Sequence, residues 1–285
     1  MTITYLDVET TFVVDENRRT DPSPFNAHNK LVSVQYSHDN GPIQFNWFYH
    51  KDMDEMSSEM TVGESFNLVQ DVLDKTTVLI GHNIKFDLMW LWESGFNYEG
   101  QVYDTMIGEY TLLRGQKWGL SLFDSCVRRK VALKKSDLIH NYMKDGIGFD
   151  AMPMEIVHEY GVADIESTKQ LHLAQEEIFK NSHNSPMRKH LKLMNKFLPI
   201  LAVIERNGIK IDFTTLENVR VDYEIEQKEL KAKMEDICRE VMGDTNINFA
   251  SPEQVSQLIY SRKVIDKKKW AEAFNICLLY TSDAA

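Results

Sequence analysis

The first ten residues constrain the fold most, because they join an apolar strand directly to two carboxylates. Residues 2–6 are β-branched or aromatic except for Leu6, which predicts a buried strand. Asp7 and Glu9 follow at positions i and i+2, so their side chains leave the strand on the same face. Two anions held this close repel each other unless a cation lies between them. The pattern fits a divalent-metal site, and it fits equally a strand end whose acids are solvated in a turn.

The overall composition is that of a globular chain with no membrane-spanning segment. Of the 285 residues, 43% are hydrophobic and 26% are charged. The apolar runs are all shorter than the roughly 20 residues that a transmembrane helix needs. Cys126, Cys238 and Cys277 are widely separated, which favours neither a disulfide framework nor a zinc site. We therefore expect a cytoplasmic protein with no membrane partner.

The acidic charge is concentrated in the first part of the chain. The net charge is −11, and residues 1–180 carry 16 Lys and Arg against 28 Asp and Glu. An acidic balance argues at first against nucleic acid as a partner. Carboxylates gathered around a metal site do not bar a polyanion, however, because the bound cations bring positive charge. The charge therefore leaves a nucleic-acid partner open.

Strand signals continue after the first strand. Residues 31–37 and 43–49 are rich in β-branched and aromatic side chains and flank an Asn40-Gly41 turn, which predicts a hairpin. With the first strand they make a three-stranded meander. Apolar residues at helical spacing over residues 64–73 then predict the first helix. This order of elements predicts an α/β fold.

A fourth strand introduces the next acidic residue. Residues 77–80 are apolar, as expected for a strand buried on both faces, and a turn at residues 81–83 leads into a helix. Asp87 lies in the first turns of that helix. This arrangement places Asp87 at the carboxyl end of a strand, where open α/β sheets bind ligands. The helix dipole is the alternative explanation for an acid at this position.

A later helix, which begins near Pro153, carries the third set of polar residues. Tyr160 and Asp164 are separated by one helical turn and so share a face. Each also has a structural explanation, Tyr160 as a core aromatic residue and Asp164 as a helix cap. The polar, turn-rich residues 181–186 follow, and they predict a domain boundary near residue 182.

The pattern changes to long helices beyond this boundary. Apolar periodicity and capping residues predict helices over residues 187–206 and 213–242, and a further helix that begins at Pro252. The second region is therefore expected to be mainly helical. The final residues, 277–285, are similar to the translation of a sequencing-library adapter, and we exclude them from fold reasoning.

The acidic segments, taken together, resemble the three motifs of the DEDD 3'–5' exonucleases that carry a tyrosine in the third motif. Asp7-Val8-Glu9-Thr10 is similar to the first motif, residues 82–87 (HNIKFD) to the second, and residues 160–164 (YGVAD) to the third. The resemblance implies that residues 1–182 form an exonuclease domain. It also implies a ribonuclease H-like fold, in which helices flank a mixed sheet.

A second resemblance concerns the helical region. Residues 198–212 and 248–255 are similar to segments of the thumb at the start of the polymerase region of family A DNA polymerases. This implies that residues 183–276 are the incomplete beginning of such a region. The palm and fingers motifs that bind deoxynucleotides are absent from this sequence. We therefore expect no polymerase active site in the chain as given.

The first resemblance also implies roles for individual residues. Asp7, Glu9, Asp87 and Asp164 would hold two divalent cations, Mg²⁺ or Mn²⁺, which prefer carboxylate oxygens. Asp7 would bridge the two ions, Glu9 and Asp164 would complete the site of one, and Asp87 would hold the other. Tyr160 would orient the attacking water and the scissile phosphate.

Four neighbouring residues are candidate contacts to the substrate. Thr10 follows the carboxylate pair and offers a backbone N–H to the 3' end. Asn83, Lys85 and Phe86 precede Asp87 in the second motif. Phe86 would stack on a base, and it is explained equally well as a core residue of its helix.

The expected function is removal of nucleotides from single-stranded or frayed DNA 3' ends. By the resemblance, this activity would proofread for a polymerase domain in the same chain, in a bacterial or phage-infected bacterial cell. One alternative is a 3'–5' exoribonuclease similar to ribonuclease D, against which only the thumb-like region argues. Another is an inactive nuclease scaffold that supports a polymerase, against which the presence of all four carboxylates argues.

Overall fold

The chain forms two compact units, Met1–Gly208 and Ile209–Ala285, each of which is described by itself. The computed structural model describes residues 2–16, 19–53, 62–131, 137–243 and 247–260. The segment similar to an adapter, residues 277–285, lies outside the described residues.

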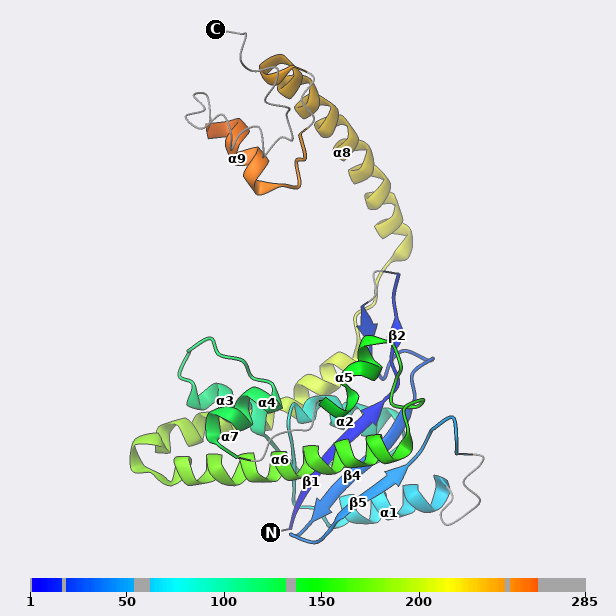
Figure 1. Cartoon of the computed structure of the whole chain (residues 1–285), viewed down its shortest axis with the longest axis vertical. Helices are drawn as coiled ribbons and strands as arrows, with labels where there is room; N and C mark the ends of the chain where they lie inside the picture. Colours follow the sequence, from blue (N-terminus) through cyan, green and yellow to red (C-terminus); the bar gives the residue numbers. More distant parts are fainter. Residues whose placement is uncertain (1, 17–18, 54–61, 132–136, 244–246, 261–285) are drawn as a thin grey trace. The chain divides into compact units, whose positions relative to one another are not determined.

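A five-stranded mixed sheet forms the centre of the first unit (Figure 1). Its strand order is β5-β4-β1-β6-β7, with β1 in the middle. β1, β6 and β7 run parallel to one another, whereas β4 runs antiparallel to both of its neighbours. The strands are β1 Ile3–Thr10, β4 Leu31–His38, β5 Ile43–Trp47, β6 Val78–Gly81 and β7 Gln101–Asp104, and a separate pair consists of β2 Val13–Val14 and β3 Thr20–Asp21. The predicted meander is therefore confirmed.

Helices cover both faces of this sheet. Residues of α1 and α2 pack with β1, β4 and β6 in the largest core cluster, and α6 packs on the opposite face. The fold is thus the ribonuclease H-like arrangement that the resemblance implied, a mixed sheet with helices on both faces. The helices of the first unit are α1 Val62–Lys75, α2 Ile84–Glu93, α3 Thr105–Leu112, α4 Leu122–Arg129, α5 Asp137–Lys144, α6 Met154–Lys180 and α7 Ser185–Asn207, with a 3₁₀ turn, η1, at Ser182–Asn184.

Alternation along β1 separates core residues from site residues. Leu6 and Val8 are buried in the core cluster shared with α1 and α2. Tyr5 packs on the other face, in the cluster that includes α6. Because successive side chains of a strand point to opposite faces, Asp7 and Glu9 lie on the α6 side with Tyr5. The two-residue period thus places both carboxylates opposite one long helix.

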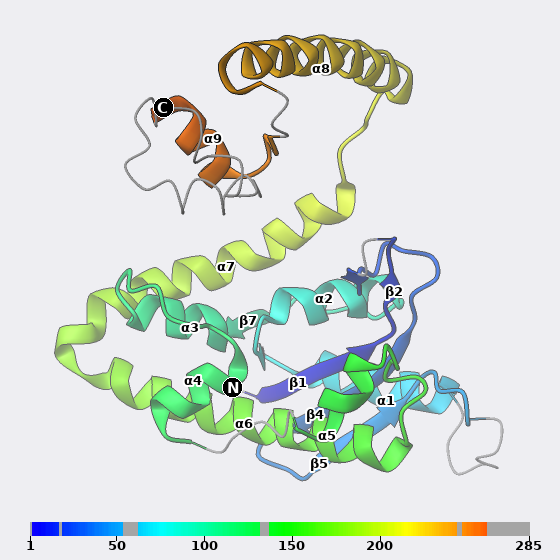
Figure 2. The same cartoon turned by 45° about the horizontal axis from the view of Figure 1, so that its top comes forward.

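α7 belongs to the first unit, although the sequence predicted a boundary near residue 182. Its buried residues, Leu191, Asn195, Leu198 and Ala202, face α2, α3 and β7. The turn-rich residues 181–186 form a tight connection between α6 and α7, which Figure 2 shows as two long helices joined end to end by a turn. The division between compact units falls later, after Gly208. The assignment of residues 183–276 to a polymerase region remains a prediction.

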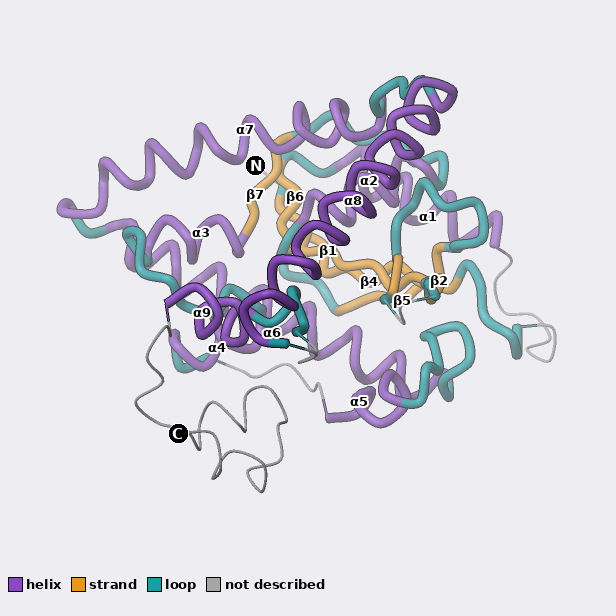
Figure 3. Tube along the Cα trace, turned by 90° about the horizontal axis from the view of Figure 1, so that it is seen from above, coloured by secondary structure: helices purple, strands orange, loops and turns teal. Residues whose placement is uncertain are grey.

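The second unit is helical in its described part, as the sequence predicted. α8 spans Phe213–Met242 and α9 spans Pro252–Tyr260 (Figure 3). The Asp212 carboxylate caps α8 by accepting hydrogen bonds from the backbone N–H groups of Thr214 and Thr215. Pro252 is the first residue of α9, where the backbone N–H that proline lacks would have no partner within the helix.

Candidate metal centre

Three carboxylates from two elements meet beside the sheet. β1 supplies Asp7 and Glu9, and α6 supplies Asp164, and their ligand oxygen atoms all lie within 4.8 Å of one another. Glu9 and Asp164 are buried, with 6% and 3% of their surface exposed, and Asp7 is partly buried. The meeting is possible because α6 crosses the face of the sheet on which Asp7 and Glu9 lie. The structure thus joins the first and third sequence motifs in one cluster.

Gln35 holds the two carboxylates of β1 in place, and the sequence did not single it out. Gln35 is the antiparallel partner of Asp7, and its Nε2 donates to Asp7 Oδ2 at 2.7 Å and to Glu9 Oε1 at 3.4 Å. Its Oε1 in turn accepts from the Ser33 hydroxyl at 3.2 Å. A long amide side chain in an otherwise buried strand was the signal that could have found it.

Gly161 explains how α6 comes close enough to the sheet. A Cβ atom at this position would lie 2.9 Å from Phe45 Cε2 and 3.0 Å from the side-chain amide of Gln35. The distance to Phe45 is shorter than real Cβ contacts and the distance to Gln35 is tighter than most, so a larger residue would require these side chains to shift. Gly161 therefore lets the helix turn that carries Tyr160 and Asp164 approach the Gln35 amide.

Tyr160 stands next to the cluster as a neutral hydroxyl. It is 5% exposed, and its ring centre lies 5.7 Å from that of Phe149. Burial is the largest cause that raises the pKa of Tyr160 well above its usual range, followed by the negative charges of Glu9 and Asp164. Because Tyr160 stays protonated at neutral pH, it can donate a hydrogen bond from its hydroxyl group.

Asp87 lies apart from the three clustered carboxylates. Its Oδ1 accepts from the backbone N–H of Val8 at 3.0 Å, and the residue is 2% exposed. Burial raises its pKa well above the usual range, and the charge of Asp7 raises it further, whereas the hydrogen bond from Val8 opposes the shift. Asp87 thus ties α2 to the strand between Asp7 and Glu9, and its role as a ligand of a second ion remains a prediction.

The start of α2 is fixed by Asp104, a second residue that the sequence motifs did not include. Asn83 has a left-handed backbone, with φ of 64°, and its N–H donates to Asp104 Oδ1 at 3.0 Å. The same oxygen accepts from the N–H of Met106 at 2.8 Å and so caps α3. Burial raises the pKa of Asp104 to about 6. This carboxylate couples the second motif to β7.

The four candidate substrate contacts occupy different settings. Thr10 is buried at an irregularity in the pairing of β1 with β4, and Asn83 is exposed. Lys85 forms an ion pair with Glu205 of α7 at 2.5 Å. Phe86 is partly buried and packs against the core cluster of α1 and α2. Their contacts to a substrate remain predictions.

The donor set fits a hard divalent cation. Carboxylate oxygens are the preferred ligands of Mg²⁺ and Mn²⁺. Three such groups with oxygen atoms within 4.8 Å of one another repel, and a bound cation offsets that repulsion. The Gln35 amide contributes only a partial positive charge. The arrangement of the side chains therefore fits a metal centre better than a solvated strand end.

No helix among the described residues has both the length and the hydropathy to span a membrane.

Comparison with known proteins identifies relatives of the first unit. DNA polymerase I of Synechocystis sp. is 28% identical over 192 residues, which cover 66% of this chain and 18% of that protein. DNA polymerase I of Borreliella burgdorferi is 23% identical over 192 residues, which cover 67% of this chain and 20% of that protein. The chain therefore spans about a fifth of the length of these curated relatives.

One solved structure matches the fold over a larger share of the chain than these sequence relatives do. The POL domain of Pol1 from M. smegmatis, in a complex with DNA primer-template and dNTP, matches with a TM-score of 0.55 and 14% sequence identity. The match covers 91% of this chain and 37% of the other. At this identity the likeness concerns the fold alone.

A family model described as 3'-5' exonuclease matches residues 21–177, which is more than half of the chain. The matched residues include the second and third motifs and most of the sheet. The resemblance found in the sequence is confirmed: the chain belongs to the 3'-5' exonuclease domain family of family A DNA polymerases.

Proposed function

We propose that this chain is a metal-dependent 3'–5' exonuclease that removes nucleotides from DNA 3' ends. The observation that carries the proposal is the cluster of Asp7, Glu9 and Asp164, whose ligand oxygens lie within 4.8 Å of one another. Membership of the 3'-5' exonuclease family supports a nuclease role. Domains of this family generally depend on divalent metals, which supports a metal at the carboxylate cluster. The relatives named DNA polymerase I support DNA as the substrate and a polymerase domain in the same protein.

The proposed metal ligands are the four predicted carboxylates. Asp7, Glu9 and Asp164 would hold one cation, and Asp87 together with Asp7 would hold a second. When bound, two divalent cations supply an activated water and stabilise charge on the attacking and leaving oxygens. Carboxylate oxygens suit both Mg²⁺ and Mn²⁺.

The remaining residues of the site position these groups. The Gln35 amide fixes the spacing of Asp7 and Glu9 through its two hydrogen bonds. Asp87 fixes α2 against β1 through the N–H of Val8. The hydroxyl of Tyr160, which lies beside Asp164 and is protonated at neutral pH, would turn to the water or to a phosphate oxygen as a hydrogen-bond donor. The thumb-like residues 183–276 would continue into the polymerase region.

The test is hydrolysis of 5'-labelled single-stranded DNA and of RNA with the same sequence. Each is incubated with Mg²⁺, with Mn²⁺ or with EDTA. We expect a metal-dependent ladder that shortens DNA from its 3' end. Asp7→Ala should abolish it, and Asp222→Ala, which removes an exposed carboxylate of α8, should not.

The folded state of the variant serves as a control, since Asp7→Ala relieves like-charge repulsion and should not lower the melting temperature in EDTA. Faster shortening of RNA than of DNA would replace the proposal with a ribonuclease D-like activity. No shortening of either substrate by folded protein would contradict the proposal and favour an inactive scaffold.

A further inference from the structure

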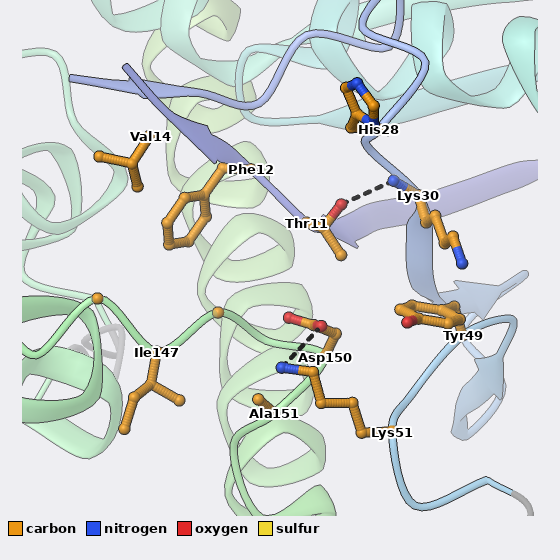
Figure 4. Close-up of a pocket in the computed structure, with 12 residues that line it drawn as sticks. Thr11, Phe12, Val14, His28, Lys30, Tyr49, Lys51, Ile147, Asp150 and Ala151 are labelled. Atoms are coloured by element: carbon orange, nitrogen blue, oxygen red, sulfur yellow. Dashed lines mark hydrogen bonds and ion pairs between the residues drawn. The ribbon is translucent and has the colours of Figure 1, made fainter. Parts of the chain in front are cut away.

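A pocket of about 710 Å³ lies in the first unit, with walls from β7, α6, α7 and the neighbouring strands. Sites for small molecules usually have volumes of about 300–1,000 Å³. The pocket shares no lining residue with the carboxylate cluster. It also differs from a smaller pocket of about 390 Å³ near the end of β1, whose wall includes Thr11, Lys30 and Lys51 (Figure 4).

α6 and β1 each contribute residues to this pocket and to the metal centre, and they set the separation of the two. On α6, His172 of the pocket comes eight residues after Asp164, which corresponds to about 12 Å along a helix. On β1, Ile3 of the pocket precedes Asp7 by four residues, which corresponds to about 13 Å along a strand. A small molecule held in the pocket would therefore occupy a site of its own.

The strands give the pocket an apolar and aromatic wall. Ile3 of β1 and Val78 and Ile80 of β6 line it. The rings of Tyr103 and His172 also line it and meet edge to face, with 4.5 Å between their centres. A flat ring of a ligand would lose contact with water against this wall, which favours binding. The wall thus suits the apolar faces of an aromatic or heteroaromatic ring.

Two buried polar side chains in the pocket each retain an atom for hydrogen bonding to a ligand. His172 and Asn195 are 7% and 6% exposed. His172 Nδ1 lies 3.0 Å from the Tyr5 hydroxyl, and Asn195 Oδ1 accepts from the Asp104 N–H at 3.3 Å. The other nitrogen atoms, His172 Nε2 and Asn195 Nδ2, have no hydrogen-bond partner within the described part of the chain. Buried polar groups usually have partners, so these two atoms favour a ligand with polar groups on its ring.

Positive charge exceeds negative charge on the helical side of the pocket. Arg188, Lys192 and Lys196 recur every four residues along α7 and therefore share one face of that helix. The Arg188 guanidinium pairs with Glu176 of α6, which is the one carboxylate among the lining residues. Neither lysine forms an ion pair with another residue that the structure describes. The two lysines are thus available to an anionic group of a ligand.

We propose that this pocket binds a nucleoside 5'-monophosphate at a site separate from the metal centre. Lys192 and Lys196 bind the phosphate, and the strand wall covers a face of the base. His172 Nε2 and Asn195 Nδ2 bond to polar atoms at the edge of the base, which carries both donors and acceptors. The choice of a mononucleotide rests on the proposed function, because hydrolysis at a DNA 3' end releases mononucleotides.

Titration calorimetry of the full chain with thymidine 5'-monophosphate tests the site. EDTA is present, so that no cation at the metal centre attracts the phosphate. Lys192→Ala and Lys196→Ala should each weaken binding about threefold. Lys189→Ala, which removes an exposed lysine of the same helix that does not line the pocket, should leave the affinity unchanged. Wild-type affinity in both pocket variants would overturn the proposal.

Two further measurements test the base and the place of binding. Thymidine and inorganic phosphate, titrated separately, should each bind at least about tenfold more weakly than the nucleotide. Inorganic phosphate that binds as tightly as the nucleotide would overturn the proposal, because the base would then contribute nothing. The Hε1 proton resonance of His172, identified by its absence in His172→Gln, should shift when the nucleotide is added. An unchanged resonance would also overturn the proposal, because the nucleotide would then bind elsewhere.

This proposal and the exonuclease proposal can fail independently, since nucleotide binding in EDTA requires no cleavage. Binding of the nucleotide in the pocket of a folded protein that shortens no strand would support the pocket and overturn the exonuclease. Metal-dependent shortening of DNA by a protein that binds no thymidine 5'-monophosphate in EDTA would overturn the pocket and leave the exonuclease intact.

Discussion

Gln35 holds Asp7 and Glu9 at a fixed spacing on the face of β1 that α6 covers. Gln35→Met keeps the length of the side chain and removes the donor to both carboxylates. Hydrogen bonds to charged groups are worth about 1.5–3 kcal/mol, so the exonuclease rate should fall about tenfold or more. The concentration of Mg²⁺ for half-maximal rate should rise, because the ligands are less well placed.

The matched control is Gln70→Met, since Gln70 also donates to a carboxylate, that of Asp74, but on α1. A Gln35→Met protein with the wild-type rate and the wild-type Mg²⁺ requirement would show that Gln35 only fills space.

His172 of α6 makes the stability of the first unit depend on pH. Its Nδ1 is 3.0 Å from the Tyr5 hydroxyl, and its ring meets that of Tyr103. Burial, with the positive charge of Arg188, lowers its pKa to about 4. In the unfolded chain His172 takes up a proton near pH 6.5, whereas in the folded chain it stays neutral down to about pH 4. The free energy of unfolding therefore falls as the pH drops from about 6.5 toward 4.

This loss is up to about 1.4 kcal/mol per pH unit from one group. Asp104, with its pKa raised to about 6, acts in the opposite direction over the same range. The effect of His172 is therefore isolated by comparing wild type with His172→Gln in urea unfolding at pH 7 and pH 5. The wild type should lose more free energy of unfolding than the variant, and equal losses would show that His172 does not contribute.

Among the contacts between secondary-structure elements, the close packing of α6 on the sheet depends on Gly161. Glycine within a helix normally costs about 0.5–1 kcal/mol relative to alanine. Gly161→Ala should nevertheless destabilise the first unit by about 1–3 kcal/mol, because the added Cβ meets Phe45 and Gln35. Urea unfolding measures the change. An increase in stability, as at an unconstrained helix position, would contradict this packing.

The position of α7 in the first unit could not be predicted from the sequence. Residues 181–186 have the composition of a linker, and the same composition suits a tight turn between packed helices. A linker and a turn differ here in the packing of the following helix, in which Leu191 and Leu198 are buried against distant elements. Asn195 Oδ1 also accepts a hydrogen bond from the backbone N–H of Asp104 at 3.3 Å. Such long-range contacts leave no local signal, so the boundary between units could not be placed from the sequence.

Across the whole molecule, local patterns in the sequence predicted the strands and the main helices. Alternation along residues 2–9 placed Asp7 and Glu9 on one face of the strand, and helical spacing paired Tyr160 with Asp164. The meander followed from the Asn40-Gly41 turn. The positioning roles of Gln35 and Asp104 could not be predicted, because their hydrogen-bond partners are distant in the sequence.

We propose that Asp7, Glu9 and Asp164 together hold a divalent cation. Titration calorimetry with Mn²⁺ measures this binding without depending on cleavage. Wild-type protein and the control Glu99→Gln, which removes an exposed carboxylate, should bind Mn²⁺ equally. Glu9→Gln and Asp164→Asn should each weaken binding about tenfold or more, since each removes a charged ligand. Equal Mn²⁺ affinity in all four proteins would show that these carboxylates do not bind the cation.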